Sequence, residues 1–146
     1  MTGAGVSLDG AIAGPTMPPP EGDTVKLSGI LIGSDNPQRL VEFYKRVLGE
    51  PGWDEAPYTG WMVGSGTVMV GPHDEVHGAN GEPGRVIWNF ETDDVKAEFE
   101  RIRATGATVV REPYNPMGPD ATQDFALATF ADPDGNYFQI ASPMEM

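Results

Sequence analysis

Apolar residues recur along residues 25–71 with two different periods, which predict one strand, one helix and three further strands. A short apolar run at 27–32 is typical of a strand, and the polar residues 34–36 after it can cap a helix that has proline in its first turn. The helix carries a single apolar stripe at helical spacing: Leu40, Phe43, Tyr44, Val47 and Leu48. Gly49 then stands where a left-handed C-terminal cap belongs. Three short segments predict an antiparallel meander: 53–57, 58–63 and 67–71.

The same order of elements returns after a polar, glycine-rich linker at 72–84. A strand at 85–91 leads to a helix with one apolar face, which ends at Gly106. Three strands follow: 107–112, 125–131 and 137–142. This internal repeat predicts an α+β fold of two βαβββ modules in tandem, at about 25–71 and 85–143.

The length and the first residues set the domain organisation. A chain of 146 residues is long enough for one domain with one sizeable core. Residues 1–24 read as a Gly/Pro-rich N-terminal arm, because they have too few apolar side chains for a core of their own. They carry no Lys or Arg and no continuous apolar stretch, so we expect no signal peptide. The domain itself is expected to span 25–146.

The charge and the composition exclude several classes of partner. The sequence has a formal net charge of −13, from 22 acidic and 9 basic side chains, which repels nucleic-acid backbones and anionic membrane surfaces. No apolar run approaches the roughly 18 residues that a membrane span needs. The chain has no cysteine, which fits a cytoplasmic protein and leaves no thiolate to hold a metal. We therefore expect a cytoplasmic protein that binds neither nucleic acid nor a membrane.

Several short motifs resemble the vicinal-oxygen-chelate superfamily, the glyoxalase/bleomycin-resistance/dioxygenase-like domains. The first half contributes Ser-Asp-Asn-Pro at 34–37, Phe-Tyr at 43–44 and Leu-Gly at 48–49. The second half contributes Glu-Thr-Asp-Asp-Val at 91–95, Ala-Thr-Gly-Ala at 104–107 and Phe-Ala-Asp-Pro-Asp-Gly-Asn at 130–136. The resemblance implies two modules whose sheets curl around a shared cavity, with the helices outside, in a protein that forms homodimers.

The resemblance also locates the positions of metal ligands in metal-bearing members. There, the first and the last strand of each module each supply one ligand, a His, Glu or Gln. In the family the first-strand ligand lies seven residues before the Asp that ends the strand. Counted back from Asp35, this position falls on Ser28, and counted back from Asp94 it falls on Ile87.

The two last-strand positions complete this set. The family's spacing from the Asp-Gly-Asn turn gives Gln139, and alignment of the two modules gives Met69. One amide, one hydroxyl, one thioether and one hydrocarbon do not make a site for a hard divalent cation. We therefore expect neither a metal nor another cofactor, and no chemistry that uses a cation as Lewis acid.

The predicted function then depends on the side chains that line the cavity. Alternation along the strands points Ile30, Ile32, Asn89, Tyr137 and Ala141 into the cavity, while Leu31, Trp88, Phe90, Phe138 and Ile140 face the helices. Trp53, Tyr58 and Trp61 can add stacking surfaces at the mouth, or belong in part to the core. The predicted ligand-binding residues are Ser28, Ile30, Trp61, Met69, Ile87, Asn89, Tyr137 and Gln139. The alternative is that these side chains fill a closed core.

Two further groups of polar residues have simpler explanations. His73 and His77 are four residues apart, but they lie in a linker flanked by proline and glycine, so we interpret them as solvated loop residues rather than metal ligands. Glu91, Asp93 and Asp94 lie where a helix begins, and acidic residues there act as caps. Neither group predicts acid–base chemistry.

Two functional hypotheses remain. The first is a metal-independent binding protein of the bleomycin-resistance type that sequesters or carries an aromatic or cationic metabolite, with the acidic charge favouring a cation. The second is a metal-free isomerase, epimerase, cyclase or lyase that uses the same cavity. The sequence supplies no inward-facing acid–base group and we assign no catalytic residue, which favours the binding protein.

Overall fold

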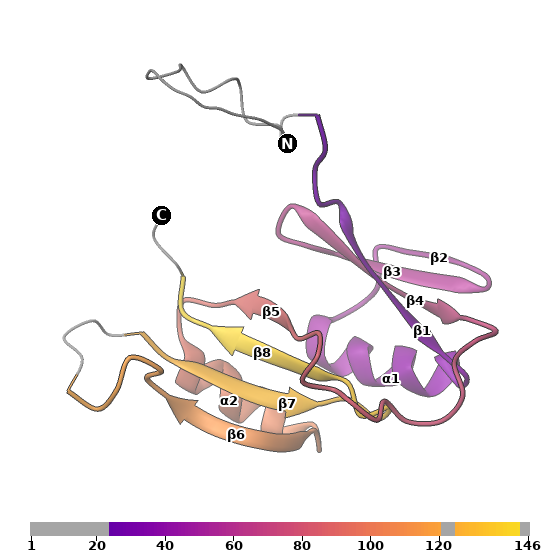
Figure 1. Ribbon diagram of the computed structural model, residues 1–146. Helices are drawn as coiled ribbons and strands as arrows, with labels where there is room; N and C mark the ends of the chain where they lie inside the picture. Colours follow the sequence, from indigo (N-terminus) through magenta and orange to yellow (C-terminus); the bar gives the residue numbers. More distant parts are fainter. Residues whose placement is uncertain (1–23, 121–124, 144–146) are drawn as a thin grey trace, which may run out of the picture.

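The computed structural model describes residues 24–120 and 125–143. Apart from Thr24, the N-terminal arm predicted from the sequence lies outside these residues. The first module consists of β1 (Gly29–Ser34), α1 (Pro37–Leu48), β2 (Trp53–Glu55), β3 (Tyr58–Val63) and β4 (Gly66–Pro72). The second consists of β5 (Trp88–Glu91), α2 (Val95–Ala104), β6 (Thr108–Tyr114), β7 (Leu127–Ala131) and β8 (Tyr137–Ala141). The α+β fold of two βαβββ modules is confirmed (Figure 1).

Each module forms its own four-stranded sheet, and the two sheets have the same topology. Their strand orders are β1-β4-β3-β2 and β5-β8-β7-β6. In both sheets the first and last strands of the module pair in parallel and the other pairs are antiparallel. A parallel first strand requires a crossover, which the helix of each module supplies.

The helix boundaries follow the cap residues expected from the sequence. The side chain of Asn36 caps α1 by accepting from the amide of Arg39 at 3.4 Å, and Asp94 caps α2 by accepting from Ala97 at 3.0 Å. Gly49 and Gly106 both have positive φ angles, of 91° and 93°, which end the helices without steric cost.

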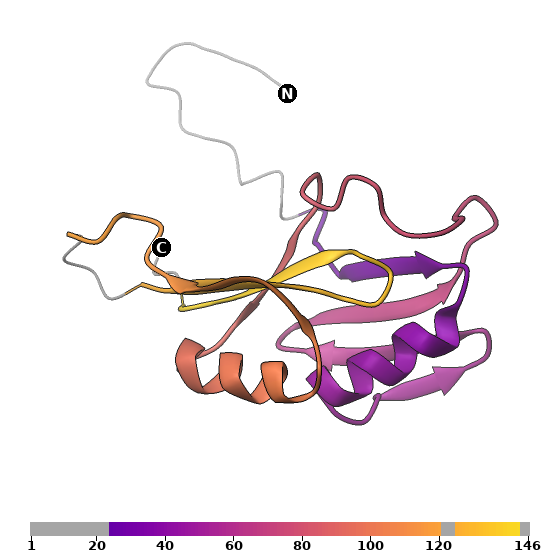
Figure 2. The same cartoon turned by 90° about the horizontal axis from the view of Figure 1, so that it is seen from below.

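One hydrophobic core joins the two modules. Its buried residues come from both sheets and both helices. From α1, the rings of Phe43 and Tyr44 lie 6.0 Å and 5.9 Å from the ring of Phe138 in the second sheet, measured between centroids. In Figure 2, α1 crosses one face of the first sheet, and α2 lies against one face of the second sheet, which is steeply inclined to the first. The first helix therefore packs against both sheets.

The predicted orientation of the first strand is wrong. Ile30 and Ile32 lie opposite Val68 and Val70 of β4, and this face packs against α1, whereas Leu31 is on the other face and 50% exposed. The second sheet is oriented as expected, because Trp88, Phe90, Phe138 and Ile140 are on the side of α2.

The error arises because the ligand position in the first strand was counted back from Asp35, one residue before the helix cap that corresponds to Asp94. The equivalent helix caps are Asn36 and Asp94, so the position that matches Ile87 is Gly29 and not Ser28. A shift of one residue exchanges the two faces of a strand. The corrected family positions are Gly29, Met69, Ile87 and Gln139, which offer no better metal ligands than the first set.

Candidate small-molecule site

A pocket of about 450 Å³ lies where the two modules meet. It is formed by the beginning of β1, the turn between β3 and β4, and β5 with the residues that precede it. The lining is Leu27, Gly29, Ile30, Val63, Ser65, Gly66, Thr67, Val68, Val86, Ile87, Trp88, Asn89 and Phe90. Its volume and its apolar walls with a few polar groups are typical of small-molecule sites.

The predicted ligand-binding residues lie in four places: the pocket, the open faces of the sheets, the segment before β1 and the core. Ile30, Ile87 and Asn89 line the pocket. Met69, Tyr137 and Gln139 lie on the open faces of the two sheets, which are the faces away from the helices. Ser28 is exposed just before β1, and its carbonyl accepts from the amide of Thr67 at 3.0 Å.

Trp61 belongs to the core rather than to the pocket. Its side chain is on the face of β3 that packs against α1, the residue is 1% exposed, and its indole Nε1 donates to the carbonyl of Gly49 at 2.8 Å. Of the three aromatic residues expected near the cavity mouth, Trp53, Tyr58 and Trp61, it is Trp61 that belongs to the core.

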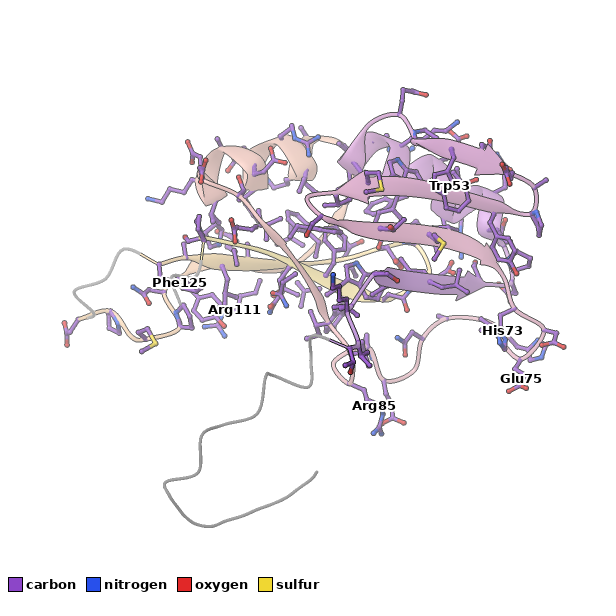
Figure 3. All side chains as sticks on the ribbon, turned by 90° about the horizontal axis from the view of Figure 1, so that it is seen from above. Trp53, His73, Glu75, Arg85, Arg111 and Phe125 are labelled. Atoms are coloured by element: carbon purple, nitrogen blue, oxygen red, sulfur yellow. The ribbon has the colours of Figure 1, made fainter. Side chains whose placement is uncertain are left out.

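The open face of the first sheet is apolar and aromatic. Trp53 lies flat against Gly60, where an added Cβ would be 2.3 Å from the indole ring, and Tyr58 lies in the same way against Gly71. Glycine is therefore required beneath both rings. Leu31, Met62 and Met69 lie on this face. Figure 3 shows Trp53 on the side of the sheet away from α1.

The open face of the second sheet carries a polar row across all four strands. Asn89 of β5 is opposite Gln139 of β8, Gln139 is opposite Thr129 of β7, and Thr129 is opposite Arg111 of β6. The side-chain Nε2 of Gln139 donates to the Thr129 hydroxyl at 3.1 Å. We refer to Asn89, Gln139, Thr129 and Arg111 as the polar row. Asn89 belongs to both the row and the pocket, so the row begins where the pocket ends.

A family model described as a glyoxalase-like domain matches residues 29–141, which is more than half of the chain. The chain belongs to this family. No curated protein matches the sequence.

Solved structures share the architecture of this glyoxalase-like domain. A glyoxalase/bleomycin resistance protein/dioxygenase family enzyme from Burkholderia phytofirmans PsJN is 20% identical, with a TM-score of 0.63 over 82% of this chain and 100% of that one. A glyoxalase-related enzyme from Fulvimarina pelagi is 19% identical, with a TM-score of 0.62 over 82% and 88%. TioX from Micromonospora sp. ML1 is 20% identical, with a TM-score of 0.60 over 82% and 99%. At these identities the likeness shows the fold.

The donor set of this glyoxalase-like domain does not suit a divalent metal. The corrected family positions include one amide and one thioether, and neither is a strong ligand for a hard cation. Within the described residues, no three His, Cys, Asp or Glu side chains gather as they would around an ion. His73 accepts from the amide of Glu75 at 3.1 Å in the exposed linker, as expected for a loop residue (Figure 3).

Two acidic groups with raised pKa values, Tyr44 and Asp132, lie at the junction of the two modules and not in the pocket. The Tyr44 hydroxyl donates to the Asp132 carboxylate at 2.8 Å. Burial raises the pKa of Tyr44 well above its ordinary value, and the charge of Asp132 adds to this shift. Burial also raises the pKa of Asp132, while hydrogen bonds from Asn136 and Tyr44 oppose the shift. Both side chains are buried in the core, so their role is structural.

In the described part of the chain, no helix is long and apolar enough to cross a membrane.

Proposed function

We propose that this glyoxalase-like domain binds a small molecule with an apolar or aromatic body and does so without a metal. The observation that carries the proposal is the pocket between the modules, which combines apolar walls with the single amide of Asn89 at the edge of the polar row. Trp88 and Phe90 in the pocket lining support an aromatic ligand, because their rings offer stacking surface. Sequestration or carriage, rather than catalysis, fits a pocket whose lining has no His, Asp, Glu, Lys or Cys. Since the chain has no cysteine, we propose a cytoplasmic location.

Filling the pocket is expected to weaken binding strongly. The neutral dye N-phenyl-naphthylamine serves as the probe, because its emission rises in an apolar site. Replacing Ile87 with Trp places a large ring in the pocket, and we expect the dissociation constant of the dye to rise at least tenfold, or about 1.4 kcal/mol. Met117→Trp is the matched control, because Met117 is exposed and outside the pocket lining. Equal dye affinity in wild type and Ile87→Trp would refute the pocket as the binding site.

We also propose that the protein acts as a homodimer in which a second copy covers the open face of the first sheet. Leu31, Tyr58 and Met62 are exposed on the first sheet, and contiguous apolar faces of this kind mark interaction sites. We expect light scattering after gel filtration to give the mass of a dimer. Met62→Asp, at a residue that is 64% exposed, should shift the protein toward the monomer, while Met117→Asp should not. A wild-type monomer at all concentrations would contradict this part of the proposal.

A further inference from the structure

The polar row contains one cation, Arg111, that forms no ion pair with any described carboxylate. Arg111 lies on the side of the second sheet away from α2 (Figure 3). Within residues 24–120 and 125–143, no carboxylate forms an ion pair with Arg111, although the whole chain has 22 acidic residues. By contrast, the described part of the chain pairs Arg39, Arg85, Arg101 and Arg103 with carboxylates.

The guanidinium of Arg111 is held in place by an aromatic ring. Its Cζ lies 3.5 Å from the centroid of the Tyr114 ring, on the same face of the sheet. Stacking on a ring fixes the plane of a guanidinium and leaves the N–H groups along its edge free to donate. This edge is the geometry that binds a carboxylate through two parallel hydrogen bonds.

The neighbour of Arg111 across the sheet supplies a second donor. The Thr129 hydroxyl accepts from Gln139, so its own proton remains to be donated. Thr129 is only 6% exposed, and a hydrogen bond to its hydroxyl would be shielded from water. The Gln139 amide keeps its carbonyl oxygen free to accept.

We propose that the ligand carries a carboxylate, which Arg111 and Thr129 bind, while its apolar body occupies the pocket. This inference rests on the proposed function and specifies its ligand class. Thr129 is two strands away from Asn89 at the pocket edge, and neighbouring strands are about 4.8 Å apart. The carboxylate is therefore separated from the apolar body by about 10 Å, two such spacings.

The negative net charge of the chain does not oppose this assignment at short range. At physiological salt, charges more than about 8 Å apart are largely screened, so the nearest charge decides which ligand group is bound. That charge is Arg111. The ligand class inferred from the polar row is therefore anionic, in contrast to the cation favoured by net charge alone.

Three probes with the same phenyl group and six-carbon chain but different head groups test the assignment by calorimetry: 6-phenylhexanoate, 6-phenylhexanamide and 6-phenylhexylamine. We expect the carboxylate to bind about ten- to a hundredfold more tightly than the amide, the range for hydrogen bonds to a charged group, and the amine to bind more weakly than both. Arg111→Gln should bring the carboxylate to the affinity of the amide, and Arg111→Lys should keep part of the difference. Arg46→Gln is the matched control, because Arg46 also lies over an aromatic ring but on α1.

The possible results separate this inference from the proposed function. Equal affinity for the carboxylate and the amide in wild type overturns the inference and leaves the binding function standing. No binding of any probe overturns both. If Arg111→Gln changes the oligomeric state but not the ratio of affinities, Arg111 belongs to the contact between copies and the inference is also overturned.

Discussion

Residues 26–71, expressed without the rest of the chain, are expected to be unfolded. In the full protein, Phe43 and Tyr44 of α1 pack against Phe138 of the second sheet, so the isolated first module would expose both rings. A fragment of this size has a marginal core even when all of its apolar surface is buried. Circular dichroism should show no cooperative thermal transition for the fragment, while the full chain unfolds in a single transition.

The complementary fragment provides the control for this experiment. Mixing residues 26–71 with residues 72–143 should restore the contacts around Phe138 and with them a cooperative transition. A cooperative transition in residues 26–71 alone would contradict the single shared core.

Replacing Asp132 with Ala is expected to destabilise the fold by about 3 to 5 kcal/mol. The Asp132 carboxylate accepts from the Tyr44 hydroxyl of the first module and from the backbone amides of Asp134 and Asn136 in its own turn. Its removal leaves these buried donors without an acceptor. For a domain of this size the loss corresponds to a fall in Tm of about 10 to 20 °C, which differential scanning calorimetry would measure.

Two variants identify the source of this effect. Tyr44→Phe removes one donor but leaves the carboxylate with its partners in the turn, so it should cost about 1 to 2 kcal/mol. Asp93→Ala changes an exposed acid beside α2 and should leave Tm nearly unchanged. A loss in Asp132→Ala no larger than in Asp93→Ala would show that the turn does not depend on this carboxylate.

The order of the elements could be predicted because it depends on local signals. The apolar stripe of α1, the caps Asn36 and Asp94, and the glycines at 49 and 106 each act within a few residues of sequence. The repeat of these signals was enough to indicate two modules.

The face on which each strand residue lies was harder to predict, because it depends on the number of residues between that position and a reference residue. In the second module, counting back from Asp94 and forward from the Asp-Gly-Asn turn placed Asn89 and Gln139 on the same face, which is the open face of the sheet. In the first module, counting from Asp35 shifted the assignment by one residue. Leu31 was therefore assigned to the helix side, and Ile30 and Ile32 to the open face, the reverse of what the structure shows. No local sequence pattern predicts the pocket either, because the pocket forms only when the two modules pack together.

Sequence reasoning did not identify Arg111 and Thr129. The pairing of β6 with β7 shifts register on both sides of Arg111, between Val109 and Arg111 and again between Arg111 and Tyr114. Irregular pairing of this kind breaks the alternation by which exposed and buried positions are counted along a strand. A basic residue three positions before a tyrosine was a signal, but only the strand pairing shows that Arg111 lies opposite Thr129, which in turn lies opposite Gln139.

Alternate residues of the strands in the first sheet face the core and the open face of the sheet. Val68 and Val70 hold the core, whereas Met69 between them lies on the open face, and Leu31 alternates with Ile32 in the same way. Mutations at open-face positions can thus accumulate without loosening the packing around α1. Gly60 and Gly71 are the exceptions, because a side chain at either would lift the ring that lies on it and change the shape of the whole face in one step. The shape of the open face can therefore change gradually, through its exposed side chains, or abruptly, through Gly60 and Gly71.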